Sequence, residues 1–311
     1  MAGRAGWRRG RAGNAGHRRA RTSAEAADQH PAQGQRSITA VPAALQPGSL
    51  SGRRTCRVAW PRQQVRAADP APAVDAYRSA GNSGLGAVAV RQSAMIAAQH
   101  LQHALSELLG DARLTVTALP GTELKLWLID DANMDRAFSP DETRRILEDP
   151  PYWCFCWASG LALARFLAEN PHWVAGKRVL DFGAGSGVAG IAALRAGALE
   201  VVACDLDPLA LAACRANAEL NQVPLRYSTD FFAEADRFDL ILVADVLYDR
   251  ANLPLLDQFL SRGREALVAD SRVRDFKHAA YQRLTMLHAH TLPDLAEPHE
   301  FRDVSLYHAA R

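Results

Sequence analysis

The stretch that decides the fold is residues 179–187, which read Val-Leu-Asp-Phe-Gly-Ala-Gly-Ser-Gly. An apolar strand runs into three glycines at alternate positions, Gly183, Gly185 and Gly187, and a helix is predicted directly afterwards. Glycines at such a turn permit positive φ and let a ligand approach the backbone closely. The N-terminus of the helix adds amide groups that have no partner within the helix. The stretch therefore predicts a ligand-binding loop in an α/β fold.

Strands and helices alternate around this loop from about residue 151 to the end of the chain. Such alternation predicts a doubly wound, mostly parallel, Rossmann-like sheet with helices on both faces. Residues 304–308 suggest a closing antiparallel pair. The predicted strands are 178–182, 200–204, 225–229, 238–244 and 266–270, and the predicted helices are 188–196, 209–221, 253–262 and 276–288.

The glycine loop is compatible with two kinds of cofactor, a dinucleotide and S-adenosylmethionine. Gly185 to Gly190 also fit the dinucleotide pattern Gly-x-Gly-x-x-Gly. Asp181 stands before the first glycine, where a carboxylate would repel a pyrophosphate. S-adenosylmethionine carries an ammonium and a sulfonium, and a carboxylate favours both cations. We therefore predict S-adenosylmethionine, with Asp181, Gly183, Gly185 and Gly187 as cofactor-binding residues.

Acidic residues follow the next two predicted strands. Asp205 ends the second strand and can accept both ribose hydroxyls, although NAD sites use the same device. Asp207 and Pro208 predict the cap and first turn of the following helix. Asp230 and Phe231 end the third strand, where an adenine acceptor beside an apolar wall is expected. A helix cap and a core aromatic are the competing interpretation of that pair.

The fourth strand ends in Asp245-Val-Leu-Tyr248. Catalytic groups lie at the carboxyl ends of strands in open α/β sheets. Asp245 and Tyr248 are therefore the predicted catalytic residues, and a strand end with a core tyrosine is the alternative. The run from Tyr152 to Trp157 alternates aromatic with small residues, which is equally compatible with a segment packed on the core. A tryptophan face attracts cations, so Trp157 is a further candidate for the cofactor site.

From about residue 150 to 311 the chain resembles the class I, seven-β-strand methyltransferases that use S-adenosylmethionine. Residues 181–187 look like their first motif, and Asp205 matches their ribose-binding acid. Within that class the chain is similar to the electron transfer flavoprotein β-subunit lysine methyltransferases and their bacterial relatives. This similarity extends through residues 151–160 and 245–249. In that family a segment equivalent to 152–157 lines the pocket, which implies that Trp157 and Ser159 lie nearest the cofactor.

The resemblance implies transfer of a methyl group to a protein lysine, with the electron transfer flavoprotein β subunit as the expected substrate. Lysine has a pKa of about 10.4, so the ammonium must lose a proton before it can attack. Asp245 would orient the amine and Tyr248 would shape an apolar channel. Three alternatives remain open: methylation of a small, nicotinamide-like molecule, methylation of a ribosomal protein, and a non-catalytic nucleotide-binding module.

Residues 1–90 differ in composition from the rest of the chain. Residues 1–91 hold 15 Arg, no Lys and 4 acidic residues, and the remainder holds 21 basic and 30 acidic residues. Such an Arg-, Ala- and Gly-rich segment without periodicity is typical of disorder. A transit peptide and a nucleic-acid-binding arm are alternatives, but we favour an upstream start-site artefact, with organised sequence beginning near Met95.

Residues 95–150 predict a small N-terminal extension. Apolar residues at helical spacing end at Gly110, two alternating runs at 114–119 and 124–129 flank a Pro-Gly turn, and Ser139 begins a further helix. The methyltransferase domain is expected over 151–311. Five cysteines without metal-binding spacing favour a reducing compartment. We expect a monomer in the cytoplasm, or in mitochondria if the chain is eukaryotic, without metal, membrane or nucleic-acid partners.

Overall fold

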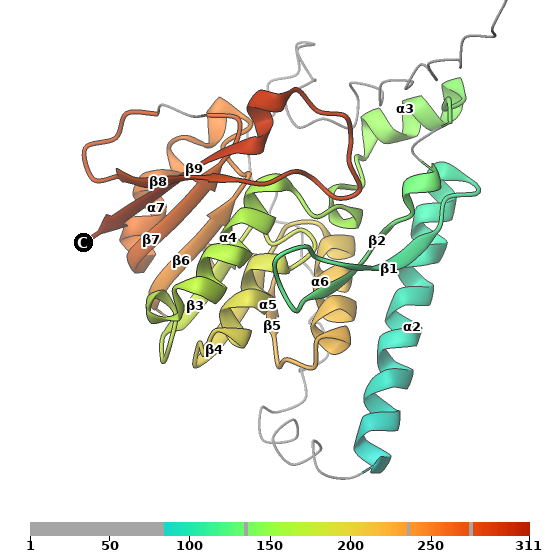
Figure 1. Cartoon of the computed structure of the whole chain (residues 1–311), viewed down its shortest axis with the longest axis horizontal. Helices are drawn as coiled ribbons and strands as arrows, with labels where there is room; N and C mark the ends of the chain where they lie inside the picture. The colour runs from blue at the N-terminus through green and yellow to red at the C-terminus, as the bar shows by residue number, and fades with distance from the viewer. Residues whose placement is uncertain (1–83, 134–135, 235–236, 274–275) are drawn as a thin grey trace, which may run out of the picture. The chain divides into compact units, whose positions relative to one another are not determined.

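The computed structural model describes residues 84–311 except 134–135, 235–236 and 274–275 (Figure 1). The expectations for residues 1–83, including Cys56, lie outside the described residues. The first described helix, α2, spans Gly84–Leu109. It thus begins before Met95 and includes residues for which the composition predicts disorder. Alanine is abundant in this stretch, and alanine has the highest helix propensity.

A single sheet of seven strands confirms the predicted Rossmann-like fold. The strands are β3 (Arg178–Phe182), β4 (Glu200–Cys204), β5 (Arg226–Ser228), β6 (Phe238–Ala244), β7 (Gly263–Asp270), β8 (Gln282–His288) and β9 (Asp303–Ala310). Their order is β5-β4-β3-β6-β7-β9-β8. The first five pair in parallel, whereas β9 is antiparallel to both β7 and β8. The carboxyl ends of β3, β4 and β6 therefore meet at one edge of the sheet.

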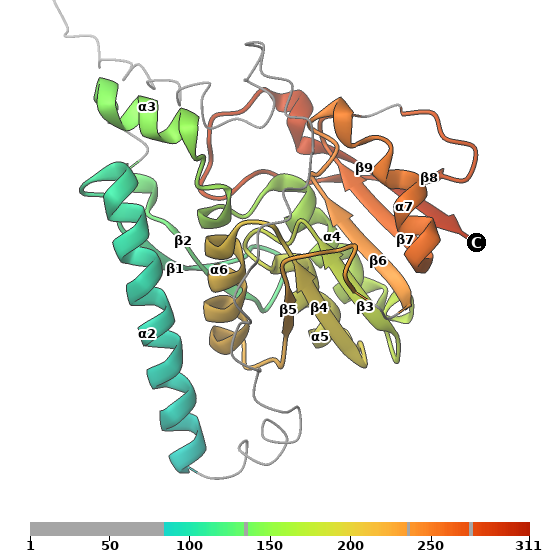
Figure 2. The same cartoon turned by 180° about the vertical axis from the view of Figure 1, so that it is seen from behind.

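Helices cover both faces of this sheet (Figures 1 and 2). Val179 of β3 packs in a buried cluster with the helices of one face, whereas the next residue, Leu180, packs with Phe259 of α7 on the other. This alternation follows from the two-residue period of a strand. The helices are α4 (Ala158–Glu169), α5 (Val188–Arg195) and α6 (Pro208–Leu220) on the first face and α7 (Leu255–Arg262) on the second.

The N-terminal extension lies beside α6 (Figure 1). Strands β1 (Leu114–Ala118) and β2 (Lys125–Ile129) form the predicted antiparallel hairpin. The amide of Trp127 donates to Asn217 Oδ1 at 2.7 Å, and the amide of Lys125 donates to Asn221 Oδ1 at 3.0 Å. Two asparagines four residues apart, one in α6 and one at its C-terminal cap, therefore hold strand β2 of the hairpin.

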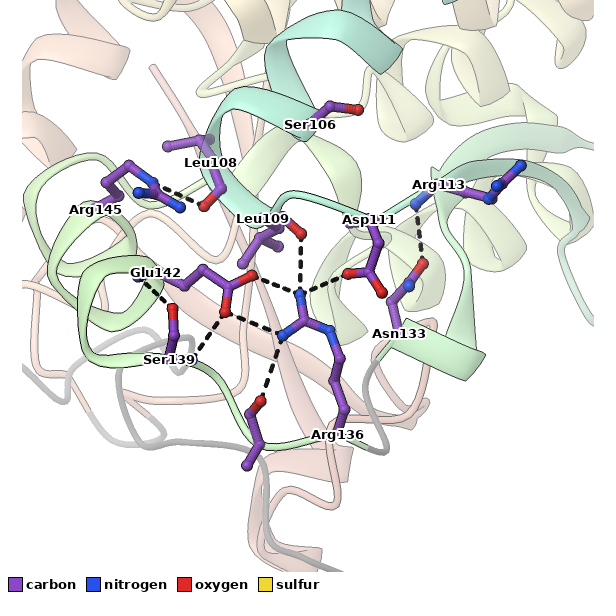
Figure 3. Close-up of polar contacts among 12 residues, drawn as sticks. Ser106, Leu108, Leu109, Asp111, Arg113, Asn133, Arg136, Ser139, Glu142 and Arg145 are labelled. Atoms are coloured by element: carbon purple, nitrogen blue, oxygen red, sulfur yellow. Dashed lines mark hydrogen bonds and ion pairs between the residues drawn. The ribbon is translucent and has the colours of Figure 1, made fainter.

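Helix α3 (Pro140–Glu148) is fastened to the end of α2 by Arg136 (Figure 3). Ser139 and Glu142 form the predicted capping box. Arg136 donates to the carbonyl of Leu109 at 2.9 Å and pairs with Glu142 at 2.7 Å and Asp111 at 2.9 Å. The hydrogen bond from Arg136 lowers the pKa of Glu142 to about 2. Because α3 leads directly into residues 150–157, this junction also sets where that aromatic segment starts.

The helix predicted over 276–288 is wrong. Residues 282–288 form β8, an edge strand that pairs antiparallel with β9. Leu, Met, Gln and Arg in this stretch favour a helix when judged alone. Pairing with β9 overrides that local preference, because propensity is a weak determinant beside tertiary contacts.

The remaining elements are short 3₁₀ turns at Asp131–Asn133, Tyr152–Cys154, Pro171–Trp173, Arg250–Asn252 and His299–Arg302. Within the described residues, no helix combines the length and apolarity needed to cross a bilayer, and no cluster of His, Cys, Asp and Glu could hold a metal ion. The thiols of Cys154, Cys156, Cys204 and Cys214 are free and buried.

Candidate functional site

The glycine loop joins β3 to α5 and turns sharply at the carboxyl end of the sheet. Gly183, Gly185 and Gly187 all have positive φ, at 66°, 53° and 79°. A Cβ on Gly183 would meet Val246 at 2.8 Å, so that position excludes any side chain. A Cβ on Gly185 would meet nothing closer than 4.0 Å. The backbone at Gly185 is therefore open to a ligand.

Asp205 links the end of β4 to this loop. Its Oδ2 accepts the amide of Gly185 at 2.9 Å, and its Oδ1 accepts the amide of Asp207 at 3.0 Å. Burial raises the pKa of Asp205. A carboxylate has about four acceptor positions, so the Asp205 carboxylate retains acceptor capacity for a ligand beside these backbone amides. Asp207 accepts the amide of Leu209 at 2.8 Å and caps α6, as its Asp-Pro sequence predicts.

A mostly apolar pocket opens between the loop and the carboxyl ends of β3, β4 and β6. It brings together six residues that the sequence singles out from four separate segments. These are Trp157, Gly183, Gly185, Asp205, Asp245 and Tyr248. Tyr152 and Trp153, from the segment that the family resemblance implies, also line the pocket, and so do residues that sequence reasoning did not assign to it: Phe182, Cys204, Leu206, Asp207, Ala210, Thr229, Ala244, Val246, Asn252 and Leu255.

Asp181 and Gly187, two predicted cofactor-binding residues of the first motif, do not line the pocket and instead make contacts beneath the glycine loop. Asp181 is 2% exposed, and its Oδ2 accepts the amide of Gly190 at 2.8 Å. Gly187 begins α5 and faces Cys214, whose Sγ would lie 3.1 Å from an added Cβ. Both residues therefore hold α5 against the sheet and α6.

Asp230 and Phe231 also lie outside the pocket lining. Asp230 Oδ1 accepts the amides of Phe232 at 2.8 Å and Ala233 at 3.2 Å, so it caps a turn. Phe231 is fully buried against Phe182 and Phe259, with ring centroids 4.9 and 5.9 Å away. Their neighbour Thr229 reaches the pocket instead.

The aromatic segment before α4 forms one wall of the pocket. Cys156 exchanges two backbone hydrogen bonds with Leu292, at 2.9 and 2.8 Å, which fixes the segment to the C-terminal part of the chain. The ring of Tyr152 lies 5.7 Å from that of Trp157 and 6.1 Å from that of Tyr248. The alternation of aromatic and small residues is compatible with such a wall. From the sequence alone, it is equally compatible with a segment packed in the core.

Asp245 also lines the pocket and has an unusual backbone conformation. Its φ is 53°, in the left-handed region, and its side chain is 9% exposed. Its carboxylate accepts hydrogen bonds from Ser159 and Ser271. Ser159 is fully buried and does not line the pocket, so it contacts Asp245 instead of standing nearest the predicted cofactor. Burial and then the charge of Asp245 raise the pKa of the neighbouring Asp270 to about 7.

Asp181→Asn is expected to stabilise the protein progressively as the pH rises from 5 to 8. Burial raises the pKa of Asp181 to about 7, so ionisation of this group opposes folding between its ordinary pKa and that value. A raised carboxyl pKa contributes stability that is present at low pH and is lost as the pH approaches 7. Asn keeps an oxygen for the Gly190 amide but cannot ionise. Relative to the unaltered protein, the variant should gain about 2 kcal/mol across this range.

Urea unfolding of both proteins at pH 5 and pH 8 measures this gain. The other titratable groups are common to both proteins, so their contributions cancel in the difference between the two free energies of unfolding. An equal stability difference at the two pH values would contradict the raised pKa of Asp181.

Comparison with known proteins places this geometry among methyltransferases. The family model of ribosomal protein L11 methyltransferase (PrmA) matches residues 167–261, which contain the glycine loop, Asp205, Asp245 and Tyr248. The electron transfer flavoprotein β-subunit lysine methyltransferase of Danio rerio is 42% identical over 153 residues, covering 46% of this chain and 59% of that protein. The ribosomal protein L11 methyltransferase of Aeromonas hydrophila is 44% identical over 92 residues, covering 30% and 24%.

These matches confirm the resemblance seen in the sequence. The chain spans about three-fifths of the length of the curated relatives that it matches first. Among solved structures, the ribosomal protein L11 methylase of Lactobacillus delbrueckii subsp. bulgaricus has a TM-score of 0.36 and 22% identity, covering 48% of this chain and 77% of that one.

Proposed function

We propose that this protein is an S-adenosylmethionine-dependent protein-lysine N-methyltransferase that acts on the electron transfer flavoprotein β subunit. The observation that carries the proposal is the pocket itself. It joins a glycine loop and a strand-end acid, which suit a nucleoside, to Asp245 and three aromatic rings, which suit an amine. The relatives named electron transfer flavoprotein β-subunit lysine methyltransferase support the choice of substrate.

The residues present fit S-adenosylmethionine. Gly185 leaves open space beside the backbone, and the Asp205 carboxylate retains acceptor capacity for a ribose hydroxyl. Phe182 and Leu206 add apolar surface next to these polar groups. When bound, the cofactor supplies an electrophilic methyl group. The chain's own task is then to hold it and to present an amine.

Presentation of the amine follows from the aromatic wall and Asp245. A lysine side chain must enter as a neutral amine, and an apolar channel lowers its pKa by disfavouring the charged form. Tyr152, Trp157 and Tyr248 provide such surroundings, and their faces also attract a cation. Asp245 can orient the nitrogen through a hydrogen bond. Positioning of this kind accounts for large rate enhancements without a strong base.

A ribosomal-protein methyltransferase is the second candidate. The PrmA family model covers residues 167–261 and the Aeromonas hydrophila relative is a ribosomal protein L11 methyltransferase. The PrmA match begins after the segment 152–157 and omits it. The match to that family thus supports the cofactor more strongly than the substrate.

The test is a methylation assay with S-adenosylmethionine labelled in its methyl group. Purified electron transfer flavoprotein, ribosomal protein L11 and nicotinamide are offered separately, and labelled products are identified as methyl-lysine by acid hydrolysis. We expect label in the flavoprotein β subunit alone. Label in L11 or nicotinamide alone would support the corresponding alternative, and binding of NAD without S-adenosylmethionine would overturn the cofactor assignment.

We also propose that the protein is a monomer. We further propose that it is located in the cytoplasm, or in mitochondria for a eukaryotic source. The four cysteines within the described part of the chain have free, buried thiols, which are compatible with a reducing compartment. Light scattering of the purified protein and microscopy of a fluorescent fusion test these two points.

A further inference from the structure

The carboxylate of Asp245 is held by two serines that the preceding mechanism does not use. Asp245 continues the sheet at its backbone, where its amide donates to the carbonyl of Ala269 at 3.0 Å. Its φ of 53° lies in a region that residues other than glycine rarely adopt. Such a conformation is strained and persists only where surrounding contacts fix it. The side-chain contacts of Asp245 show what fixes it.

Ser159 and Ser271 together supply the donors. Ser159 Oγ donates to Asp245 Oδ1 at 2.5 Å and Ser271 Oγ donates to the same oxygen at 2.9 Å. The amide of Ser159 donates to Oδ2 at 2.9 Å. The amide of Ser271 lies 3.4 Å from Oδ1. Since an oxygen of a carboxylate has two acceptor positions, Oδ1 is saturated and Oδ2 retains one.

Both serines stand on rigid parts of the fold. Ser159 is the second residue of α4, and its amide is one of those that an α-helix leaves without an internal partner. Ser271 directly follows β7. The two side chains are 0% and 1% exposed, so water does not compete for their hydroxyls. Asp245 is therefore tied to α4, to β7 and to its own strand β6.

We propose that Ser159 and Ser271 are positioning residues that anchor Oδ1 of Asp245 and leave Oδ2 to receive an N–H of the acceptor amine. This inference rests on the proposed function, because it assigns the free oxygen to the amine. Asp245 lines the pocket, so its remaining acceptor position is available to a molecule bound there.

Sinefungin tests the arrangement without any need for turnover. This analogue of S-adenosylmethionine carries a primary amine in place of the methyl-sulfonium group, and S-adenosylhomocysteine carries neither. Calorimetric titration of the full chain with both ligands isolates the contribution of the amine. Ser159→Ala and Ser271→Ala should each weaken sinefungin about tenfold, the scale of one hydrogen bond to a charged group, and leave S-adenosylhomocysteine unaffected.

Ser305→Ala is the matched control. Ser305 is fully buried in β9 opposite Asp270, and its Oγ has no hydrogen-bond partner. This variant removes a buried hydroxyl from the same sheet and should bind both ligands as the unaltered protein does. Thermal melting of all three variants verifies that each is folded.

The outcomes separate this inference from the proposed function. Unchanged sinefungin affinity in both Ser159→Ala and Ser271→Ala would overturn the positioning role. Equal weakening of both ligands would also overturn it, since that result indicates a structural defect of the pocket. Failure of the unaltered protein to methylate any substrate would instead overturn the proposed function, and the sinefungin difference would still be measurable.

Where turnover is measured, both variants should lower kcat about tenfold with little change in the KM for the cofactor.

Discussion

Asp245→Asn is expected to lower the single-turnover rate of methyl transfer by about 10²–10³-fold, the usual effect of losing one oriented electrostatic contact. The variant keeps the size of the side chain and one acceptor oxygen but loses the negative charge that favours an ammonium. If that oxygen stays with the two serine hydroxyls, the new amide nitrogen faces the amide of Ser159, and two donors then oppose each other. A modest fall in melting temperature should therefore accompany the loss of rate.

Binding and rate must be measured on the same variant. S-adenosylhomocysteine affinity should stay near that of the unaltered protein, because the hydrogen bonds of Asp245 to Ser159, Ser271 and Ala269 do not involve the glycine loop. Asp249→Asn is the matched control. Asp249 lies four residues further along and caps a 3₁₀ turn through the amide of Ala251 at 2.8 Å, which Asn can also do. Near-normal turnover of Asp245→Asn on the protein substrate would remove the role proposed for this carboxylate.

The parts of the fold that sequence reasoning predicts well are those with a local cause. The bounds of β3, β4 and β6 coincide with the predicted strands, because each is an apolar run that ends at glycine or aspartate. The capping box at Ser139 and the Asp207-Pro208 start of α6 likewise depend on residues within one helical turn. Predictions from such local patterns hold in the folded protein because the tertiary contacts favour the same local structure.

The parts that sequence reasoning misses depend on contacts between distant residues. Ser159 and Asp245 are 86 positions apart, and Ser271 is 26 positions from Asp245. No spacing rule links serines so far away, although the Asp-x-x-Tyr pattern points to Asp245 itself. The edge strand β8 shows the same limit, because only its pairing with β9 distinguishes it from a helix.

The two acids of the predicted cofactor motif have different positions in the structure, which the sequence pattern does not reveal. Asp181 and Asp205 both belong to the pattern that predicts the cofactor, yet only Asp205 lines the pocket. The side chain of Asp181 lies on the face of the sheet that α5 covers, so close to Gly190 that a Cβ added to this glycine would lie 2.9 Å from Asp181 Oδ2. A prediction based on charge alone therefore places Asp181 beside the ligand, whereas packing places it beneath the loop.

Asp205→Ala is expected to weaken the binding of S-adenosylhomocysteine by about 100-fold, or about 3 kcal/mol. Two losses add in this variant. The nucleoside loses its charged acceptor, and the amides of Gly185 and Asp207 lose the carboxylate that holds the loop against β4. The pocket would then be both less polar at the ribose position and less well ordered, so affinity should fall more than the rate of transfer at saturating cofactor.

Asp239→Ala is the control that separates these effects from the general cost of removing an acid. Asp239 likewise accepts a backbone amide, from Arg178 at 2.9 Å, but it lies at the amino end of β6, away from the pocket. Calorimetric titration of both variants should show weakened binding for Asp205→Ala and unchanged binding for Asp239→Ala. If Asp205→Ala bound the ligand as tightly as the unaltered protein, the nucleoside could not lie at the carboxyl end of β4. The assignment of the glycine loop to S-adenosylmethionine would then lose its structural basis.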